Sequence, residues 1–344
     1  MPGAGGSSAG TTGAAGTAGT AGTTGAAGTT GAAGAAATAG TTGAAGSSAG
    51  TGGGSAGSGS GGSSGAAGIA GGGRGVTGGS AGAAGSAGAG GATADPCATA
   101  LFCDDFEKYT TGQAPTSPWS RQVSSGSTAA VDTAQFHSGA KSVKFVAASG
   151  SGSKTAYIRL MSTSILPVMP NMFYGRMMFR LEAAPTGDVH WTLLEGYGVV
   201  PNSSPSYHAL YRYGGQHPVM NGTTFVGSQM MANYETPDSY SNVGPKSDCW
   251  KHSNKIVVPE GRWACAEWQF DGTSNTMRFW LDGAAVDSLT VMGSGEGCGT
   301  ATPVWTAPNF ERMDLGWESY QQDTARTIWI DDVALSKTRI GCPQ

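Results

Sequence analysis

Three polar residues recur at even spacing in the segment HALYRYGGQ, residues 208–216. Successive side chains of a β-strand point to opposite faces, so His208, Arg212 and Gln216 share one face of this predicted strand. The set suits β-elimination from a uronic acid, in which an arginine or an amide neutralises the carboxylate and a histidine removes the C5 proton. We therefore assign candidate catalytic roles to Arg212 and Gln216, and treat His208 as one candidate base.

A second candidate base begins another strand-like segment. His190 leads the alternating run HWTLLEG, and Tyr234 in MMANYET is the nearest tyrosine that could protonate the leaving oxygen. Each residue also has a structural interpretation, in which His190 is hydrogen-bonded within a sheet and Arg212 pairs with a local glutamate. Their occurrence on adjacent predicted strands favours the catalytic interpretation.

Two glutamates beside tryptophans suggest a different chemistry. Glu267 lies in CAEWQF and Glu318 in GWESY, and a glycosidase would need two such carboxylates about 5–10 Å apart. The E-x-D-x-x-E strand motif of jelly-roll glucanases is missing from the sequence. Glu267 also points the same way as Cys265, which indicates an interior position if that cysteine forms a disulfide. We therefore rank hydrolysis below elimination.

Aromatic residues allow a third, non-enzymatic interpretation. Trp191, Tyr213 and Trp317, with Glu318 beside the last of them, are candidates for contact with sugar rings. A carbohydrate-binding module needs only such an aromatic platform, whereas elimination needs His190 and Arg212 to converge. Binding without turnover is therefore the main alternative to lyase activity.

The segments that must position these residues follow one another after residue 95. Short alternating runs such as KSVKFVA, GRMMFRLE and TMRFWLDG are separated by turns, and Asp271-Gly272 is a strong hairpin signal. No amphipathic helix of useful length is present. Many strands without helices predict an all-β jelly-roll sandwich, and about 250 residues suit one such domain, residues 95–344.

The preceding residues 1–94 have a different composition. They consist almost entirely of Gly, Ala, Thr and Ser, with Arg74 as their one charged residue and no aromatic residue. Such a chain cannot bury enough apolar surface to offset the entropy of ordering it, so we predict a disordered, flexible tether. A silk-like or ice-binding sheet is the alternative, although the irregular glycine spacing works against regular stacking.

Charge and cysteine usage limit the partners and the compartment. The 344 residues contain 19 Lys and Arg against 23 Asp and Glu, a net charge of −4 that argues against a nucleic-acid partner. No run of about 18 apolar residues predicts a membrane span. Six dispersed cysteines, without zinc-site spacing, predict disulfides in an exported or cell-surface protein. We expect a monomer. We also expect that the export signal is missing from this sequence and that it could include an upstream lipid anchor.

The order of several motifs resembles a known family. FCDDFEKYTTGQAP, DTAQFHSGAKSVKF, GRWACAEWQFDGTSNTMRFWLDG, MDLGWESYQQD and IWIDDVALSKTRIGC follow one another as in the cellulose-induced protein of filamentous fungi and its bacterial relatives. The resemblance covers nearly all of residues 101–342. It implies a concanavalin-like jelly roll close to glucuronan and alginate lyases, and it places His190, Arg212 and Gln216 where the family carries His, Arg and Gln.

The resemblance also implies a calcium ion that pins the first and last strands. Glu107 and Asp331 match acidic ligands of the family, and oxygens near Ser138 and Lys141 match the rest, Lys141 only through its carbonyl because an ammonium cannot coordinate a metal. Calcium prefers six to eight oxygen ligands, and a link between such distant residues would stabilise the fold. The alternative is that one of the adjacent Asp331 and Asp332 is solvated while the other accepts backbone hydrogen bonds.

The disulfide pairing is open from the residues alone, because six cysteines allow fifteen pairings. The resemblance implies a bond between Cys265 and Cys342. Cys97 and Cys103, close in sequence, could then form a small local loop, and Cys249 with Cys298 would remain. The resulting expectation is an exported, calcium-stabilised jelly roll that acts on or binds a uronic-acid or cellulose-associated plant polysaccharide, with lyase activity preferred.

Overall fold

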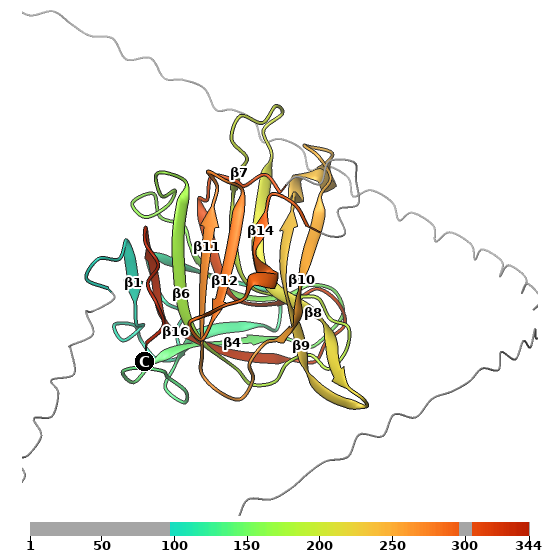
Figure 1. Cartoon of the computed structure of the whole chain (residues 1–344). Helices are drawn as coiled ribbons and strands as arrows, with labels where there is room; N and C mark the ends of the chain where they lie inside the picture. The colour runs from blue at the N-terminus through green and yellow to red at the C-terminus, as the bar shows by residue number, and fades with distance from the viewer. Residues whose placement is uncertain (1–96, 296–304, 344) are drawn as a thin grey trace, which may run out of the picture. The chain divides into compact units, whose positions relative to one another are not determined.

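The structure, a computed structural model, describes residues 97–295 and 305–343 (Figure 1). Its regular structure consists of β-strands and two short 3-10 helices, η1 (Pro237–Ser241) and η2 (Asp287–Leu289), with no α-helix in these ranges. The expectation of an all-β sandwich is confirmed. The predicted tether, residues 1–94, lies outside the described residues. No helix within the described ranges is long and apolar enough to cross a membrane.

Nine strands form the first sheet, and all of their pairings are antiparallel. Along the main path the order is β13 (Ala284–Ala285), β12 (Thr276–Leu281), β11 (Ala264–Asp271), β6 (Met172–Leu181), β16 (Arg326–Ser336), β4 (Ser142–Ala147) and β3 (Thr128–Asp132). β1 (Phe102–Asp104) pairs with β16, and β14 (Val291–Met292) pairs with β12. Figure 1 shows β6, β11 and β12 side by side.

Seven strands form the second sheet, which carries the candidate site. Their order is β10 (Asp248–Val257), β9 (Thr224–Glu235), β8 (His208–Asn221), β7 (Trp191–Val199), β15 (Arg312–Ser319), β5 (Lys154–Leu160) and β2 (Trp119–Val123). Neighbours in both sheets come from distant parts of the chain, as β5 and β15 do. The register of these long-range pairs therefore decides which side chains meet.

The core between the sheets is largely aromatic. Tyr213 of β8 packs on Phe270 of β11 at 6.0 Å between ring centroids, which joins the two sheets. Trp191 of β7 and Trp317 of β15 stack at 4.7 Å, and both are fully buried. Because strands alternate, the neighbours of these rings along each strand point to the outer face of the seven-stranded sheet.

The first and last strands lie together, with Phe102 opposite Leu335. The pairing of β16 with β6 shifts in register between Asp331 and Ala334, and Asp332 has a φ of 48°. This bulge accounts for the two adjacent aspartates, because it locally breaks the alternation of the strand. Asp331 is buried, while Asp332 is partly exposed.

Two predicted disulfides are present, Cys97–Cys103 and Cys265–Cys342. The second joins β11 to the segment after β16, with 5.9 Å between the Cα atoms. The third predicted pair, Cys249–Cys298, includes residue 298, which lies outside the described residues. Cross-links of this kind are typical of exported proteins.

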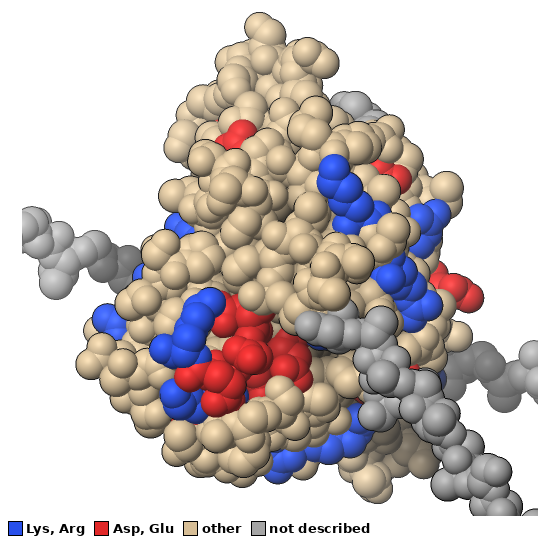
Figure 2. Space-filling view, turned by 90° about the vertical axis from the view of Figure 1, so that its left-hand side faces the viewer, with Lys and Arg blue, Asp and Glu red and all other residues tan. Residues whose placement is uncertain are grey.

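Charged side chains are sparse on the face drawn in Figure 2. The figure shows Asp and Glu gathered in one patch with Lys and Arg beside it, while most of the remaining surface in that view is uncharged. Further Lys and Arg side chains lie along the right-hand side of that view.

Candidate functional site

A cleft of about 460 Å³ lies over the outer face of the seven-stranded sheet, between β2, β5, β7, β8 and β15. The residues that line it include Tyr157, Arg159, Glu195, Arg212, Asp314 and Glu318. All six of these are ionisable, although the same strands bury apolar residues on their other face. The cleft is therefore the part of the sheet where polar chemistry is concentrated.

The ionisable residues form a row across the strands. Asp314 of β15 lies directly opposite Arg159 of β5 on one side and Glu195 of β7 on the other. Glu195 lies opposite Arg212 of β8, and Arg212 lies opposite Asn233 of β9. Directly opposed residues have Cβ atoms about 4.5–5.5 Å apart, so the register alone brings these five side chains together.

Arginine–carboxylate pairs connect one half of this row. Arg159 holds Asp314 with two hydrogen bonds of 2.8 Å, from Nε and Nη2. Arg312, which precedes Asp314 on the same face of β15, donates from Nη2 to Glu195 Oε1 at 2.9 Å. Bidentate contacts of this kind fix the position of both partners.

Arg212 is the centre of the other half of the row. Its Nε donates to Glu195 Oε2 at 3.0 Å, and its Nη1 donates to Asn233 Oδ1 at 3.3 Å and to Glu235. Arg212 is 8% exposed. A guanidinium buried to this degree is stable only because carboxylates surround it, so its charge is already compensated in the free protein.

The two neighbouring carboxyl groups of the row titrate differently. Burial raises the pKa of Asp314 to about 6, even though Arg159 and Arg312 act against it. Burial would also raise the pKa of Glu195, but Arg212 and Arg312 outweigh this effect and hold it below its ordinary value. Glu195 therefore stays ionised near neutral pH, while Asp314 gains a proton in mildly acidic solution.

Tyr157 lies on the floor of the cleft and has an unusual environment. It is 2% exposed, and its hydroxyl has no hydrogen-bond partner within the described residues. Its strand neighbours Ala156 and Ile158 belong to the apolar core, so Tyr157 faces the cleft instead. Burial, together with the charge of Glu318, raises its pKa well above the ordinary value. The phenol is therefore a neutral hydrogen-bond donor without an acceptor in the described residues.

His190 precedes β7 at the end where Trp191 lies opposite Gly215, outside the lining of the cleft, and Tyr320 links it to Arg212. The rings of His190 and Tyr320 are 4.5 Å apart, the Tyr320 hydroxyl is 3.0 Å from Thr192 Oγ1, and the Arg212 guanidinium carbon is 5.5 Å from the Tyr320 ring centroid. Burial and then the charge of Arg212 lower the pKa of His190 to about 3. Its Nε2 is buried without a hydrogen-bond partner in the described part of the chain. The imidazole is thus neutral near neutral pH.

The other predicted catalytic residues on β8 do not join this group. The side chain of Gln216 donates to Asp188 Oδ1 at 3.0 Å, beyond the point where the β8–β9 register shifts. His208 pairs with Asp238 at 2.7 Å and stacks on Tyr197 at 4.8 Å. Each residue is four positions from Arg212, or roughly 13 Å along an extended strand. Even spacing along β8 therefore places His208, Arg212 and Gln216 on one face of the sheet, but it does not bring them together at one site.

Four predicted site residues are corrected by the structure. Trp191, Tyr213 and Trp317, predicted to contact sugar rings, and Tyr234, predicted as a proton donor, belong to the core between the sheets, on the side of their strands away from the cleft, so sugar rings and substrate oxygens cannot reach them. The hydroxyl of Tyr234 donates to the Thr306 carbonyl. Their burial follows from alternation: Tyr213 is next to the outward Arg212, and Trp317 is next to the outward Glu318. Glu318 does line the cleft.

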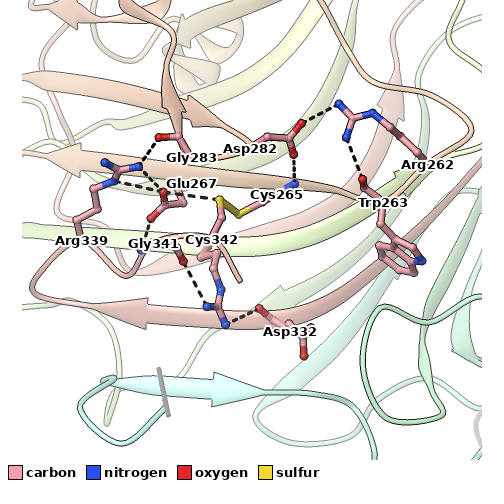
Figure 3. The surroundings of a disulfide bond; sticks show 11 residues. Arg262, Trp263, Cys265, Glu267, Asp282, Gly283, Asp332, Arg339, Gly341 and Cys342 are labelled. Carbon is pink, nitrogen blue, oxygen red and sulfur yellow. Dashed lines mark hydrogen bonds and ion pairs between the residues drawn. A yellow bond between two sulfur atoms is a disulfide. The ribbon is translucent and has the colours of Figure 1, made fainter. Parts of the chain in front are cut away.

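The predicted glycosidase pair is also corrected. Glu267 lies on β11 of the nine-stranded sheet, whereas Glu318 lies on β15 of the other sheet. Figure 3 shows Glu267 beside the Cys265–Cys342 disulfide, where Arg339 Nη2 and the Gly341 amide each donate to it at 2.7 Å. Glu267 therefore fastens the C-terminal segment to the sheet.

The residues expected to bind calcium are engaged in hydrogen bonds with other groups of the chain. Glu107 Oε1 accepts hydrogen bonds from the backbone amides of Ala140 and Lys141, both at 2.7 Å. The ammonium of Lys141 lies 2.6 Å from the Glu107 carbonyl and 3.0 Å from the Tyr109 carbonyl. A cationic side chain thus occupies the position next to the oxygens that a metal would need.

Asp331, the other expected acidic ligand, has a similar set of partners. Its Oδ2 accepts from the backbone amides of His137 and Ser138, at 2.8 and 3.1 Å, and its Oδ1 accepts from the Asp332 amide. Ser138 Oγ donates to Asp332 at 2.6 Å. Within the described ranges no group of three or more His, Cys, Asp or Glu side chains is arranged to hold a metal. These contacts do not fit a calcium ion.

One family model matches most of the chain. The family model "Cip1-like, core domain", of the polysaccharide-lyase-like type, matches residues 105–338. Among solved structures, "Cellulose induced protein, Cip1" is 23% identical with a TM-score of 0.48, over 70% of this chain and 100% of that one. An endo-β-1,4-glucuronan lyase from the fungus Trichoderma reesei is 14% identical with a TM-score of 0.46, over 70% of this chain and 96% of that one. No curated protein matches the chain.

Proposed function

The chain belongs to the Cip1-like family of polysaccharide-lyase-like proteins, and we propose that it cleaves uronic-acid-containing polysaccharide by β-elimination in the cleft of the seven-stranded sheet. Membership makes it a polysaccharide-related jelly-roll protein. The finer assignment of the reaction draws on the side chains of the cleft.

The unpartnered hydroxyl of Tyr157 is the observation that carries this proposal. A buried polar group without a hydrogen bond costs about 1–3 kcal/mol of folding free energy. Tyr157 bears that cost beside Arg212 and Glu318, in the lining of an open cleft. A hydroxyl buried only for packing would be expected to have a partner, whereas one that donates a proton to a bound substrate must be left free.

The proposed reaction uses three groups of the chain. Arg212 binds the uronate carboxylate and acidifies the C5 proton, and neutral His190 takes that proton. The C5–H electron pair forms the C4–C5 double bond as the C4–O4 bond breaks. Tyr157 gives its proton to O4, and the protonation states of His190 and Tyr157 are then restored from solvent.

The compartment forms part of the same proposal. The disulfides Cys97–Cys103 and Cys265–Cys342 favour a protein that works outside the cytoplasm, where such bonds persist. A long Gly-, Ala-, Thr- and Ser-rich segment, residues 1–94, precedes the domain and would act as a spacer. A protein of this kind could meet insoluble polysaccharide at a cell surface.

Binding without turnover is the second candidate, and one observation favours it. Glu195 and Glu235 already compensate the charge of Arg212. A guanidinium in that state is a good hydrogen-bond donor for a glycan but a weaker neutraliser of a carboxylate. Under this alternative Tyr157 would donate a hydrogen bond to a sugar oxygen and no bond would break.

An assay for unsaturated sugars separates these candidates. The purified full chain, with its disulfides intact, would be incubated with several uronate polymers, and the ultraviolet absorbance of C4–C5 unsaturated ends would be followed. Elimination predicts a signal that Tyr157→Phe reduces by about 10²–10⁴-fold. Tyr174→Phe, on the other sheet, is the matched control. Retention on the polymers without any absorbance would support binding alone.

A further inference from the structure

We infer that the polymer processed in this cleft carries isolated uronic acids between neutral sugars, rather than consecutive uronic acids. The inference rests on the proposed function and deepens it. It starts from the charges that line the cleft and from the partners that each of them already has.

The cleft has no surplus of positive charge. Its lining contains Arg159, Arg212 and Arg312, and against them Glu195, Asp314 and Glu318. Glu235 adds a further carboxylate in contact with Arg212. Each of the three arginines forms an ion pair with at least one of these carboxylates. A bound carboxylate must therefore share its guanidinium with a carboxylate of the protein.

Arg212 keeps donors for one such carboxylate. A guanidinium has five N–H donors, and the contacts with Glu195, Asn233 and Glu235 use Nε and Nη1. Nη2 has no hydrogen bond within the described part of the chain. Tyr157 adds a neutral donor nearby, so one substrate carboxylate can be bound at the centre of the row.

Carboxylates on the neighbouring sugars of the polymer would not meet unused hydrogen-bond donors of this kind. The row from Arg159 to Asn233 spans five adjacent strands, roughly 19 Å at the usual strand spacing, which accommodates several sugar rings. A polymer of consecutive uronic acids would place a carboxylate on each ring, beside Asp314 or Glu235. Like charges this close repel, most strongly at low ionic strength, whereas neutral rings would meet hydrogen-bonding groups.

The test compares polymers of different charge spacing. The full chain would be assayed for unsaturated ends on gellan and hyaluronan, whose uronic acids are separated by neutral sugars, and on glucuronan and polygalacturonate, in which they are consecutive. At low ionic strength we expect kcat/KM to be at least about tenfold higher for the first pair. Removing one compensating charge, with Glu235→Gln, should narrow that difference, whereas the exposed control Glu182→Gln should not.

The outcomes separate this inference from the proposed function. A higher kcat/KM on consecutive uronates, or a preference that Glu235→Gln leaves unchanged, would overturn the inference while elimination itself stood. The absence of unsaturated ends on all four polymers would instead overturn the proposed function, and this inference with it.

An independent set of contacts carries a second inference: Lys141 does the cross-linking for which a divalent cation would otherwise be needed. Its ammonium bonds the carbonyls of Glu107 and Tyr109, in the loop that follows β1. The turn that contains Lys141 also donates backbone amides to Glu107 and to Asp331 of β16. The turn thus joins the start and the end of the domain by protein contacts alone.

Thermal unfolding of the full chain tests this second inference. We expect the same Tm with a chelator and with excess calcium, and a Tm several degrees lower for Lys141→Met than for the exposed control Lys255→Met. Lys141→Asp, which replaces the ammonium by a third carboxylate, should make the Tm rise with calcium. A wild-type Tm that falls by several degrees in the chelator, or Lys141→Met matching its control, would overturn the inference.

Discussion

Each outer face of the sandwich holds a buried glutamate paired with an arginine, and the two pairs differ in what surrounds them. Glu195 pairs with Arg212 in the cleft of about 460 Å³, and Glu267 pairs with Arg339 beside a hollow of about 430 Å³. Both glutamates are at most 5% exposed. Neither the ion pair nor the volume of the hollow distinguishes the two faces.

The surrounding partners do distinguish them. The donors to Glu267 come from the C-terminal segment, which the Cys265–Cys342 disulfide also holds to the sheet. The Glu267–Arg339 pair therefore helps to attach this segment to the sheet. In the lining of the cleft that holds Glu195, the hydroxyl of Tyr157 is buried without a partner in the described ranges, and Nε2 of His190, beyond Tyr320, is buried in the same state. An unpartnered group that can give or take a proton is therefore a better mark of a reactive site than a buried ion pair.

The largest expected effect is on turnover at Tyr157 and His190. Tyr157→Phe and His190→Ala should each lower the rate of elimination by about 10²–10⁴-fold, because each removes a proton-transfer group. Tyr157→Phe should not lower the free energy of unfolding, since the hydroxyl that it removes has no partner. Steady-state kinetics and urea unfolding would measure the two effects. A Tyr157→Phe variant that is destabilised but fully active would reverse the comparison.

The opposite result is expected on the other face. Glu267→Gln should lower the free energy of unfolding by about 1–3 kcal/mol, because it weakens charge-assisted hydrogen bonds to Arg339 and Gly341. It should leave kcat/KM unchanged, since Glu267 lies on the sheet away from the cleft. Loss of activity in a folded Glu267→Gln protein would show that the pair is more than a fastening.

A smaller effect is expected from the carboxyl of Asp314. Burial raises its pKa from 3.8 to about 6. Between these values the folded protein keeps a proton that the unfolded chain releases, so the free energy of unfolding should fall as pH rises, by up to about 1.4 kcal/mol per unit. Asp314→Asn should flatten this slope in urea unfolding from about pH 4 to 6. Part of the slope should remain in this variant, because burial also raises the pKa of Asp331 to about 6.

The smallest effect is expected at Gln216. Its side chain lies away from the row and donates a hydrogen bond to the exposed Asp188. Gln216→Ala should therefore change kcat/KM less than about twofold and the free energy of unfolding by no more than about 0.5 kcal/mol. A large loss of turnover would mean that the cleft extends to the far end of β8.

Much of the fold was accessible from sequence because its signals are local. Alternation in segments such as GRMMFRLE and the Asp271-Gly272 turn predicted strands that the structure contains. The disulfide implied by the family resemblance, Cys265–Cys342, is also present, and so is Cys97–Cys103, which was expected from closeness in sequence. The bulge at Asp331 and Asp332 was not foreseen, because it depends on the pairing of β16 with β6.

The site was only partly accessible, for a physical reason. The alternation of side chains along a strand correctly placed Arg212 on the outer face. The same rule predicts that its neighbour Tyr213 is buried. In KTAYIRL, alternation likewise predicts that Tyr157 and Arg159 lie on the opposite face of the strand from Ala156 and Ile158. Which strands adjoin, and in which register, is decided by long-range pairing, so the row from Arg159 to Asn233 could not be read from the chain.

The central claim is that the protein cleaves uronate polymers by β-elimination in the cleft. One measurement tests this claim directly. The full-length wild-type protein and its Tyr157→Phe variant would be incubated with uronate polymers, and C4–C5 unsaturated ends would be counted by ultraviolet absorbance and by the masses of the products. The account predicts unsaturated oligosaccharides from the wild type and a rate lower by about 10²–10⁴-fold for the variant. Saturated products, or equal rates for the two proteins, would contradict it.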